Sequence, residues 1–310
     1  MYEEKEKIRV LLISGRVNGD HYYPVCNERA RILLEATGKF EVKINEEFNG
    51  CTEATLKDYD VIFLNYDGTA SLFRYGLPYV RWNPETEQVF FNFIKNGGSL
   101  YLHHTSLNLP ADLPDEFYRI WGTARGKGFG LPGGRFWHPL MPDGSFAVKF
   151  TDNNPFAKNL PKQFHVIRED FFSNIPIDPE ANVEVLASVY DDLQLWLDGW
   201  DTLPESRKAS LGVEKPEDIP SVNKWQPVAW TNTYGAGRIF ANALGNDYET
   251  WNRIPYMTLL CRGVEWAATG KITIEPPDLS GNRKYRAWPY YDNIPEDCKN
   301  LKDVNIRLSY

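Results

Sequence analysis

Residues 227–247 decide the fold of this chain and read PVAWTNTYGAGRIFANALGND. Two runs of β-branched and aromatic residues flank Tyr-Gly-Ala-Gly at positions 234–237, a pattern that is typical of two strands joined by a tight turn. A loop of small and polar residues follows, and then an amphipathic stretch that ends at Gly270, a natural helix stop. The stretch therefore predicts two strands, a loop and a long helix, in that order.

The region before this stretch alternates between apolar strands and amphipathic helices. The expected strands span residues 8–14, 40–44, 59–66 and 99–102, and the expected helices span residues 27–37 and 84–96. This order predicts an α/β fold with a doubly wound, mostly parallel sheet and helices on both faces. Ligands of such sheets bind beyond the carboxyl ends of the strands, so we expect the loops after Ser14, Tyr66, Leu102 and Leu244 to meet at one edge.

Residues 1–270 are expected to form one domain, because no low-complexity linker divides them. Further strands are predicted over residues 146–150, 183–189 and 272–274. Residues 193–225 show no clear periodicity and carry three tryptophans, which predicts a surface insertion. Residues 271–310 are rich in Pro and Tyr and predict an extended tail that packs on the domain or on a neighbouring subunit, which leaves a homo-oligomer open.

The composition argues against several classes of protein. The chain has 310 residues, of which 42% are hydrophobic and 25% charged, and its formal net charge is −8. This acidic balance argues against nucleic acid or an anionic membrane as the main partner, and no apolar run is long enough to span a bilayer. The charged N-terminal residues lead directly into a strand without a signal-peptide pattern, so we expect a cytoplasmic protein. The four cysteines are scattered, which predicts reduced thiols.

The stretch 227–247 and its continuation Glu249-Thr250-Trp251 closely resemble the C-terminal signature of the trehalose-utilisation (ThuA-like) family. Residues 98–106 and 133–139 resemble two further family motifs, and the resemblance covers the chain from about residue 8 to residue 270. It implies the flavodoxin-like fold of class I glutamine amidotransferases. It also implies a small-molecule carbohydrate as partner, with oxidised disaccharides such as 3-keto-glycosides as candidate substrates. An aromatic content of 14% fits that reading, because Trp and Tyr rings can cover the C–H face of a sugar.

The resemblance places the family histidine on His103, at the end of the strand over residues 99–102. Amidotransferases hold their nucleophilic cysteine at this strand-to-helix turn, and the absence of cysteine here excludes cysteine acyl transfer. Glu169 matches the family glutamate. The resemblance thus implies His103 and Glu169 as the acid/base candidates, and we expect His103 to be partly exposed in a pocket.

The remaining candidates are residues that would bind the substrate. They are Asn18, Asp20, His21, His104, His138, Asn246 and Asp247. Asn246 stands where the family often has histidine, and an amide cannot act as a general base. His165 is expected to lie outside the site.

Two alternatives stay open at this point. His103, His138 and Glu169 could hold a divalent metal such as zinc or manganese, or the same polar groups could bind a polyol without metal. We favour an enzyme acting on a sugar or keto-sugar, and the alternative is a non-catalytic sugar-binding or assembly protein that keeps the pocket. The replacement of the family histidine by Asn246 favours the second class.

Overall fold

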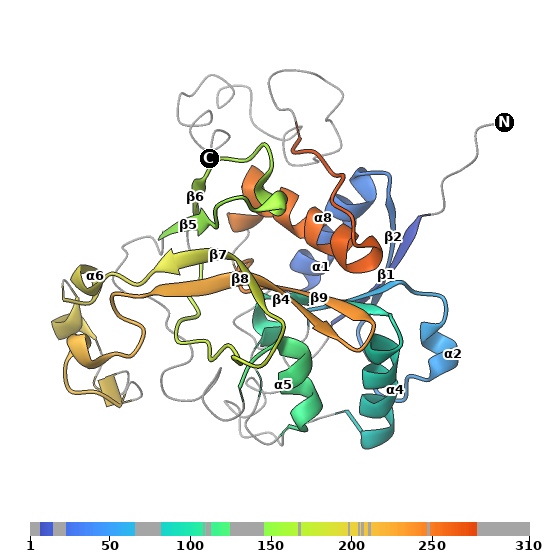
Figure 1. Cartoon of the computed structure of the whole chain (residues 1–310), viewed down its shortest axis with the longest axis horizontal. Coiled ribbons are helices and arrows are strands. Elements are labelled where there is room, and N and C mark those ends of the chain that lie inside the picture. Colours follow the sequence, from blue (N-terminus) through green and yellow to red (C-terminus); the bar gives the residue numbers. More distant parts are fainter. Residues whose placement is uncertain are drawn as a thin grey trace.

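The computed structural model describes residues 7–14, 23–65, 82–107, 109, 113–124, 146–166, 169–197, 199–203, 205, 208–209, 212–246 and 249–277. In this part of the chain nine strands form one sheet, in the order β2-β1-β3-β4-β9-β8-β7-β5-β6 (Figure 1). The strands are β1 (Ile8–Ile13), β2 (Phe40–Asn45), β3 (Val61–Leu64), β4 (Ser99–His103), β5 (Phe146–Phe150), β6 (Gln163–Val166), β7 (Glu184–Tyr190), β8 (Trp225–Tyr234) and β9 (Gly237–Asn242). The α-helices are α1 (Tyr23–Ala36), α2 (Glu53–Leu56), α4 (Pro84–Lys95), α5 (Asp115–Trp121), α6 (Leu193–Leu197) and α8 (Ile254–Thr269).

Strands β2, β1, β3, β4 and β9 form the parallel half of the sheet. Helices α1 and α8 cover one face of this half, and α4 and α5 lie on the other (Figure 1). Every residue of β3 and β4 is buried, as expected for parallel strands that are covered on both faces. These observations confirm the predicted doubly wound α/β fold and the predicted positions of its parallel strands.

Strands β8, β7, β5 and β6 extend the sheet in antiparallel pairing, so the whole sheet is mixed. The change of direction begins at the hairpin between β8 and β9, because a two-residue turn joins only antiparallel strands. Gly235 in this turn has φ 59°, and a Cβ there would lie 2.5 Å from the carbonyl oxygen of Lys95. The turn therefore requires glycine, which allows it to pack against the end of α4.

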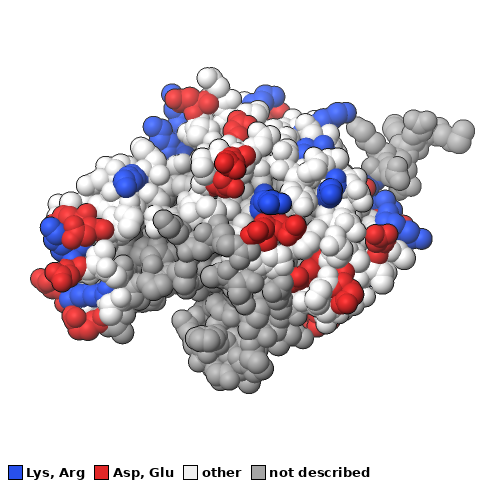
Figure 2. Space-filling view, turned by 60° about the horizontal axis from the view of Figure 1, so that its bottom comes forward, with Lys and Arg blue, Asp and Glu red and all other residues white. Residues whose placement is uncertain are grey.

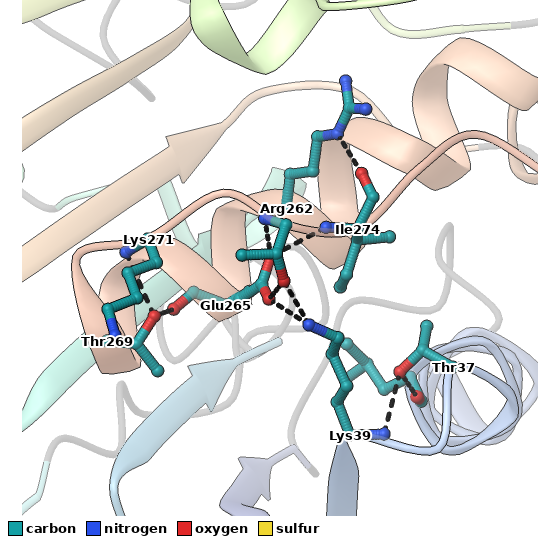
Figure 3. Close-up of polar contacts among 9 residues, drawn as sticks. Thr37, Lys39, Arg262, Glu265, Thr269, Lys271 and Ile274 are labelled. Carbon is teal, nitrogen blue, oxygen red and sulfur yellow. Dashed lines mark hydrogen bonds and ion pairs between the residues drawn. The ribbon is translucent and has the colours of Figure 1, made fainter.

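The C-terminal described segment differs from the sequence prediction. Residues 272–274 form no strand, because the backbone N–H groups of Thr273 and Ile274 donate to the Glu265 carboxylate at 2.7 and 3.1 Å. Lys39 donates to the same carboxylate at 2.7 Å, and Arg262 Nε donates to the Ile274 carbonyl at 2.6 Å (Figure 3). The segment is thus bound to α8 by side chains rather than to the sheet by a ladder of backbone hydrogen bonds.

The described residues of the insertion 193–225 are more ordered than its sequence pattern predicts. It contains α6 and two short 3₁₀ turns, and it buries a small apolar cluster of its own. The cluster consists of Trp196, Leu203, Ile219 and Val222. Prolines and tryptophans obscure the periodicity of such short elements, so the sequence pattern missed them.

The surface of the described residues carries mixed charge. On the face drawn in Figure 2, Lys and Arg side chains are interspersed with Asp and Glu, and no broad field of one sign is visible among them. In the described ranges no helix is long and apolar enough to cross a membrane.

Candidate functional site

Strand β4 ends at His103, between β3 and β9 in the middle of the parallel half. The next residue, His104, has φ 38° and begins a 3₁₀ turn over His104–Leu107. Ser106 closes this turn by donating to the His103 carbonyl at 2.8 Å. The left-handed conformation at the strand-to-helix turn therefore belongs to His104, one residue after the position that the family motif indicates.

The strand register places one polar residue at the carboxyl end of each of four neighbouring strands. His103 pairs with Asn242, Leu102 with Leu64, and Leu64 with Ile13. Paired residues of neighbouring strands point to the same face of the sheet, and side chains alternate between the two faces along each strand. Ser14 and Asn65, which follow Ile13 and Leu64, therefore lie on the same face as His103 and Asn242. The resulting row across β1, β3, β4 and β9 consists of Ser14, Asn65, His103 and Asn242. We call it the polar row.

His103 is held by hydrogen bonds on both ring nitrogens. Nδ1 lies 3.0 Å from Asn65 Oδ1, and Nε2 lies 2.9 Å from the hydroxyl of Tyr256. Asn65 Nδ2 donates to Asn27 Oδ1 at 2.8 Å, so Asn65 Oδ1 is left to accept the Nδ1–H of His103. Nε2 then accepts the Tyr256 hydroxyl proton, and this arrangement suits a neutral imidazole.

The expected partial exposure of His103 is wrong, because only 1% of this residue is accessible. The loop after β9 and the start of α8 pack over the imidazole. The ring of Trp251 lies 5.1 Å from that of His103, centroid to centroid. Gly245 has φ 113°, and a Cβ there would lie 2.3 Å from both His103 Nε2 and the Tyr256 hydroxyl. Only glycine allows the loop to pass this close to the imidazole.

Glu169 lies buried beside the same loop. Its two carboxylate oxygens accept the backbone N–H groups of Gly245 at 3.0 Å and Asn246 at 2.9 Å. Burial raises the pKa of Glu169 from 4.5 to about 8, although these two donors act in the opposite direction. The raised pKa favours the protonated form of this carboxyl group near neutral pH.

His104 connects Glu169 to a second carboxylate. Its Nδ1 donates to the Ala243 carbonyl at 2.7 Å and lies 3.9 Å from Glu169 Oε1. Its Nε2 lies 3.8 Å from Asp170 Oδ2, and its ring stacks on Phe172 at a centroid distance of 4.9 Å. His104, Glu169 and Asp170 form a compact set of titratable groups, which we call the His104 cluster.

The structure thus brings together four of the predicted site residues at the carboxyl edge of the sheet. They are His103, His104, Glu169 and Asn246. The other predicted residues, Asn18, Asp20, His21, His138 and Asp247, lie outside the described residues. His165 is exposed on β6 at the far end of the sheet order, away from β4.

Sequence reasoning missed Asn27, Asn65, Asp170 and Tyr256. Asn65 ends a predicted strand, so the rule that sites lie at carboxyl ends offered a signal for it. Tyr256 offered none, because it is 153 residues from His103 and reaches the imidazole only through the packing of α8.

The predicted zinc or manganese site does not fit the part of it that is described. The described residues contain no group of three or more His, Cys, Asp or Glu that could hold a metal ion. Both nitrogens of His103 are already hydrogen-bonded, and both oxygens of Glu169 accept backbone N–H groups. His138 lies outside the described residues.

The fold defines an α/β protein of the class I amidotransferase-like type. The family model for ThuA, described as trehalose utilisation, matches residues 9–267, and the chain belongs to this family. That membership supports a role related to carbohydrate.

Solved structures that share the fold include two ThuA-like proteins. A ThuA-like protein of Parabacteroides merdae is 22% identical with a TM-score of 0.61, covering 88% of this chain and 94% of its own. A ThuA-like protein of Bacteroides uniformis is 17% identical with a TM-score of 0.57, covering 92% of this chain and 98% of its own. No curated protein matches the chain.

Proposed function

We propose that this protein is an enzyme that acts on a sugar or keto-sugar, such as a 3-keto-glycoside, by acid/base catalysis. Glu169 and His104 carry the proton transfers, and Asn246 binds the substrate. The observation that carries the proposal is the buried Glu169 carboxyl, held by two backbone N–H groups with its pKa raised to about 8. Family membership supports the carbohydrate substrate.

The chemistry follows from the two environments in the His104 cluster. A carboxylic acid that is protonated near neutral pH can give its proton to the glycosidic oxygen as that bond breaks, while water adds to the anomeric carbon and releases the proton that His104 takes. His104 Nδ1–H donates to the Ala243 carbonyl, and its Nε2 lies 3.8 Å from Asp170 Oδ2. Asp170 stabilises the imidazolium that forms when Nε2 takes a proton.

His103 has a different role in this proposal. Both of its nitrogens are hydrogen-bonded to protein side chains, so it positions the loop at Gly245 and, through that loop, the Glu169 carboxyl. Candidate substrate contacts from Asn18, Asp20, His21, His138 and Asp247 remain predictions from the family motifs.

A non-catalytic sugar-binding protein is the second candidate. It is favoured by the full hydrogen bonding of His103 and by Asn246, whose amide can bind a hydroxyl but cannot act as a general base. Such a protein would bind the sugar with the same polar groups and would not convert it.

The test is turnover of trehalose and of its 3-keto derivative by the purified protein, followed by NMR. Glu169→Gln should lower the rate by at least about 100-fold, because it removes the acid and keeps the shape. His165→Ala, on the exposed face of β6, is the control and should act as the wild type. Binding of either sugar without turnover would support the second candidate, and unchanged turnover in Glu169→Gln would contradict the assignment of the acid.

A further inference from the structure

The order in which the chain adds strands to the sheet changes direction at β1. Strand β2 pairs with one side of β1, and β3, followed by β4, continues on the other side. In open α/β sheets this reversal separates the loops that leave neighbouring strands and opens a crevice outside their carboxyl ends, where ligands bind. In this chain Ser14 follows β1 and Asn65 follows β3, so both border the reversal point.

Asn65 adjoins two groups that have no hydrogen-bond partner. Ser14 is its neighbour in the polar row, and Asn27 of α1 accepts its side-chain N–H. Ser14 is fully buried and Asn27 is 2% exposed. Within the described part of the chain, neither Ser14 Oγ nor Asn27 Nδ2 has a partner. Because Asn27 Oδ1 is held by Asn65, the free Nδ2 is fixed as a donor.

Two buried donors without an acceptor are unusual, because each unmade hydrogen bond destabilises the fold. Both donors are uncharged, which suits a neutral oxygen better than an ionised group. The groups beside them continue through Asn65 to His103 and Tyr256, so an oxygen bound here would lie next to the network that positions the Gly245 loop.

We propose that Ser14 and Asn27 form a subsite that binds one hydroxyl or keto oxygen of the sugar at the reversal point between β1 and β3. This inference rests on the proposed function and adds to it the residues that select the substrate. The Ser14 hydroxyl and the Asn27 N–H both donate to the bound oxygen. Asn65 keeps the Asn27 amide in the orientation that presents its N–H groups.

The experiment measures the affinity for trehalose and for its 3-keto derivative by titration calorimetry. Ser14→Ala removes one donor and should weaken binding about tenfold, the ordinary effect of losing one hydrogen bond. Asn27→Asp keeps the oxygen that holds Asn65 but replaces the donor by an acceptor, and it should weaken binding at least as much. A loss confined to the keto-sugar would identify the bound oxygen as the keto group.

Ser99→Ala is the matched control. Ser99 is the first residue of β4, at the opposite end of that strand from the polar row, and its hydroxyl is also buried without a partner among the described residues. Ser14→Ala and Ser99→Ala should both melt at or above the wild-type temperature, since each removes an unpaired polar group. Of these two serine variants, only Ser14→Ala should lose affinity. Wild-type affinity in both Ser14→Ala and Asn27→Asp would overturn the subsite while leaving the proposed function intact. Failure of the wild type to bind either sugar would overturn both.

Discussion

The hydroxyl of Tyr256 lies 2.9 Å from Nε2 of His103, and the backbone of Gly245 passes beside both. This contact links the first turn of α8 to the end of β4, the two elements between which the loop after β9 must pass. The same loop presents its N–H groups to Glu169, so a perturbation of the His103–Tyr256 pair should reach the buried carboxyl.

Tyr256→Phe should lower the free energy of unfolding by about 1–3 kcal/mol, because it leaves the buried Nε2 of His103 without its donor. Urea denaturation measures this change. Tyr234→Phe, at the half-buried end of β8, is the control and should change stability by less than about 0.5 kcal/mol. Equal stability of Tyr256→Phe and the wild type would show that the hydrogen bond is not made.

Gly245→Ala should be among the most destabilising single changes at this edge. The new Cβ would meet His103 and Tyr256 at 2.3 Å, and the φ of 113° adds backbone strain. Gly50→Ala separates the two effects, because Gly50 has φ 85° but open space around a Cβ. Chemical denaturation should show a loss of about 1 kcal/mol for Gly50→Ala and about 3 kcal/mol or more for Gly245→Ala. Similar losses would mean that the loop relaxes away from His103.

Glu169→Gln should change how stability depends on pH. Burial raises the pKa of Glu169 to about 8 from 4.5, so between these values the folded protein holds a proton that the unfolded chain releases. The stabilisation that comes from this bound proton is fully present below about pH 4.5 and is lost as the pH rises through 8. Over this range the free energy of unfolding falls by up to about 1.4 kcal/mol per pH unit. Urea midpoints measured from about pH 5 to about pH 8.5 should fall less steeply in Glu169→Gln than in the wild type. Glu41→Gln, exposed on β2, should keep the wild-type slope.

Glu265→Gln should change how stability depends on pH in the acidic range, below about pH 4.5. Burial alone would raise the pKa of Glu265, but the hydrogen bonds from Lys39 and Thr273 outweigh it and lower the pKa below 4.5. The ionised carboxylate thus stabilises the fold above pH 4.5, and this contribution is lost as the pH falls through the lowered value. Near neutral pH the variant should unfold about 2 kcal/mol more easily, because the C-terminal segment loses a charged acceptor.

Acid denaturation is the measurement for Glu265→Gln, and its stability curve should be flatter than that of the wild type below about pH 5. Glu275→Gln alters an exposed carboxylate of the same segment and should change little. Matching curves for Glu265→Gln and the wild type would contradict the assignment of the contacts in Figure 3.

The protein should release no ammonia from glutamine, and iodoacetamide under native conditions should leave its activity unchanged. The turn after β4 carries His104 rather than cysteine. Cys26 and Cys51 lie elsewhere and are half-buried, and burial raises the pKa of the Cys261 thiol to about 12, which suppresses its thiolate. Ammonia release that alkylation abolishes would disprove this assignment.

The sequence predicted the parallel strands to within about two residues, as the comparison of residues 59–66 with β3 (Val61–Leu64) illustrates. It failed for residues 272–274, whose β-branched pattern suits a strand but whose N–H groups bind Glu265. The sequence also placed His103 correctly at the end of a strand. The prediction that His103 is partly exposed was wrong, because a motif carries no information about which helix packs over it.

The sequence by itself determined the alternation of strands and helices and the arrival of His103 and His104 at a strand end. Both depend on patterns within a few residues, where side-chain periodicity is a local property of the chain. Only the tertiary structure decided the burial and the hydrogen-bond partners of those histidines. The contact of His103 with Tyr256 joins residues 153 apart, and that of Glu169 with Gly245 joins residues 76 apart. The pKa of Glu169 depends on burial, which arises only when these distant segments pack together.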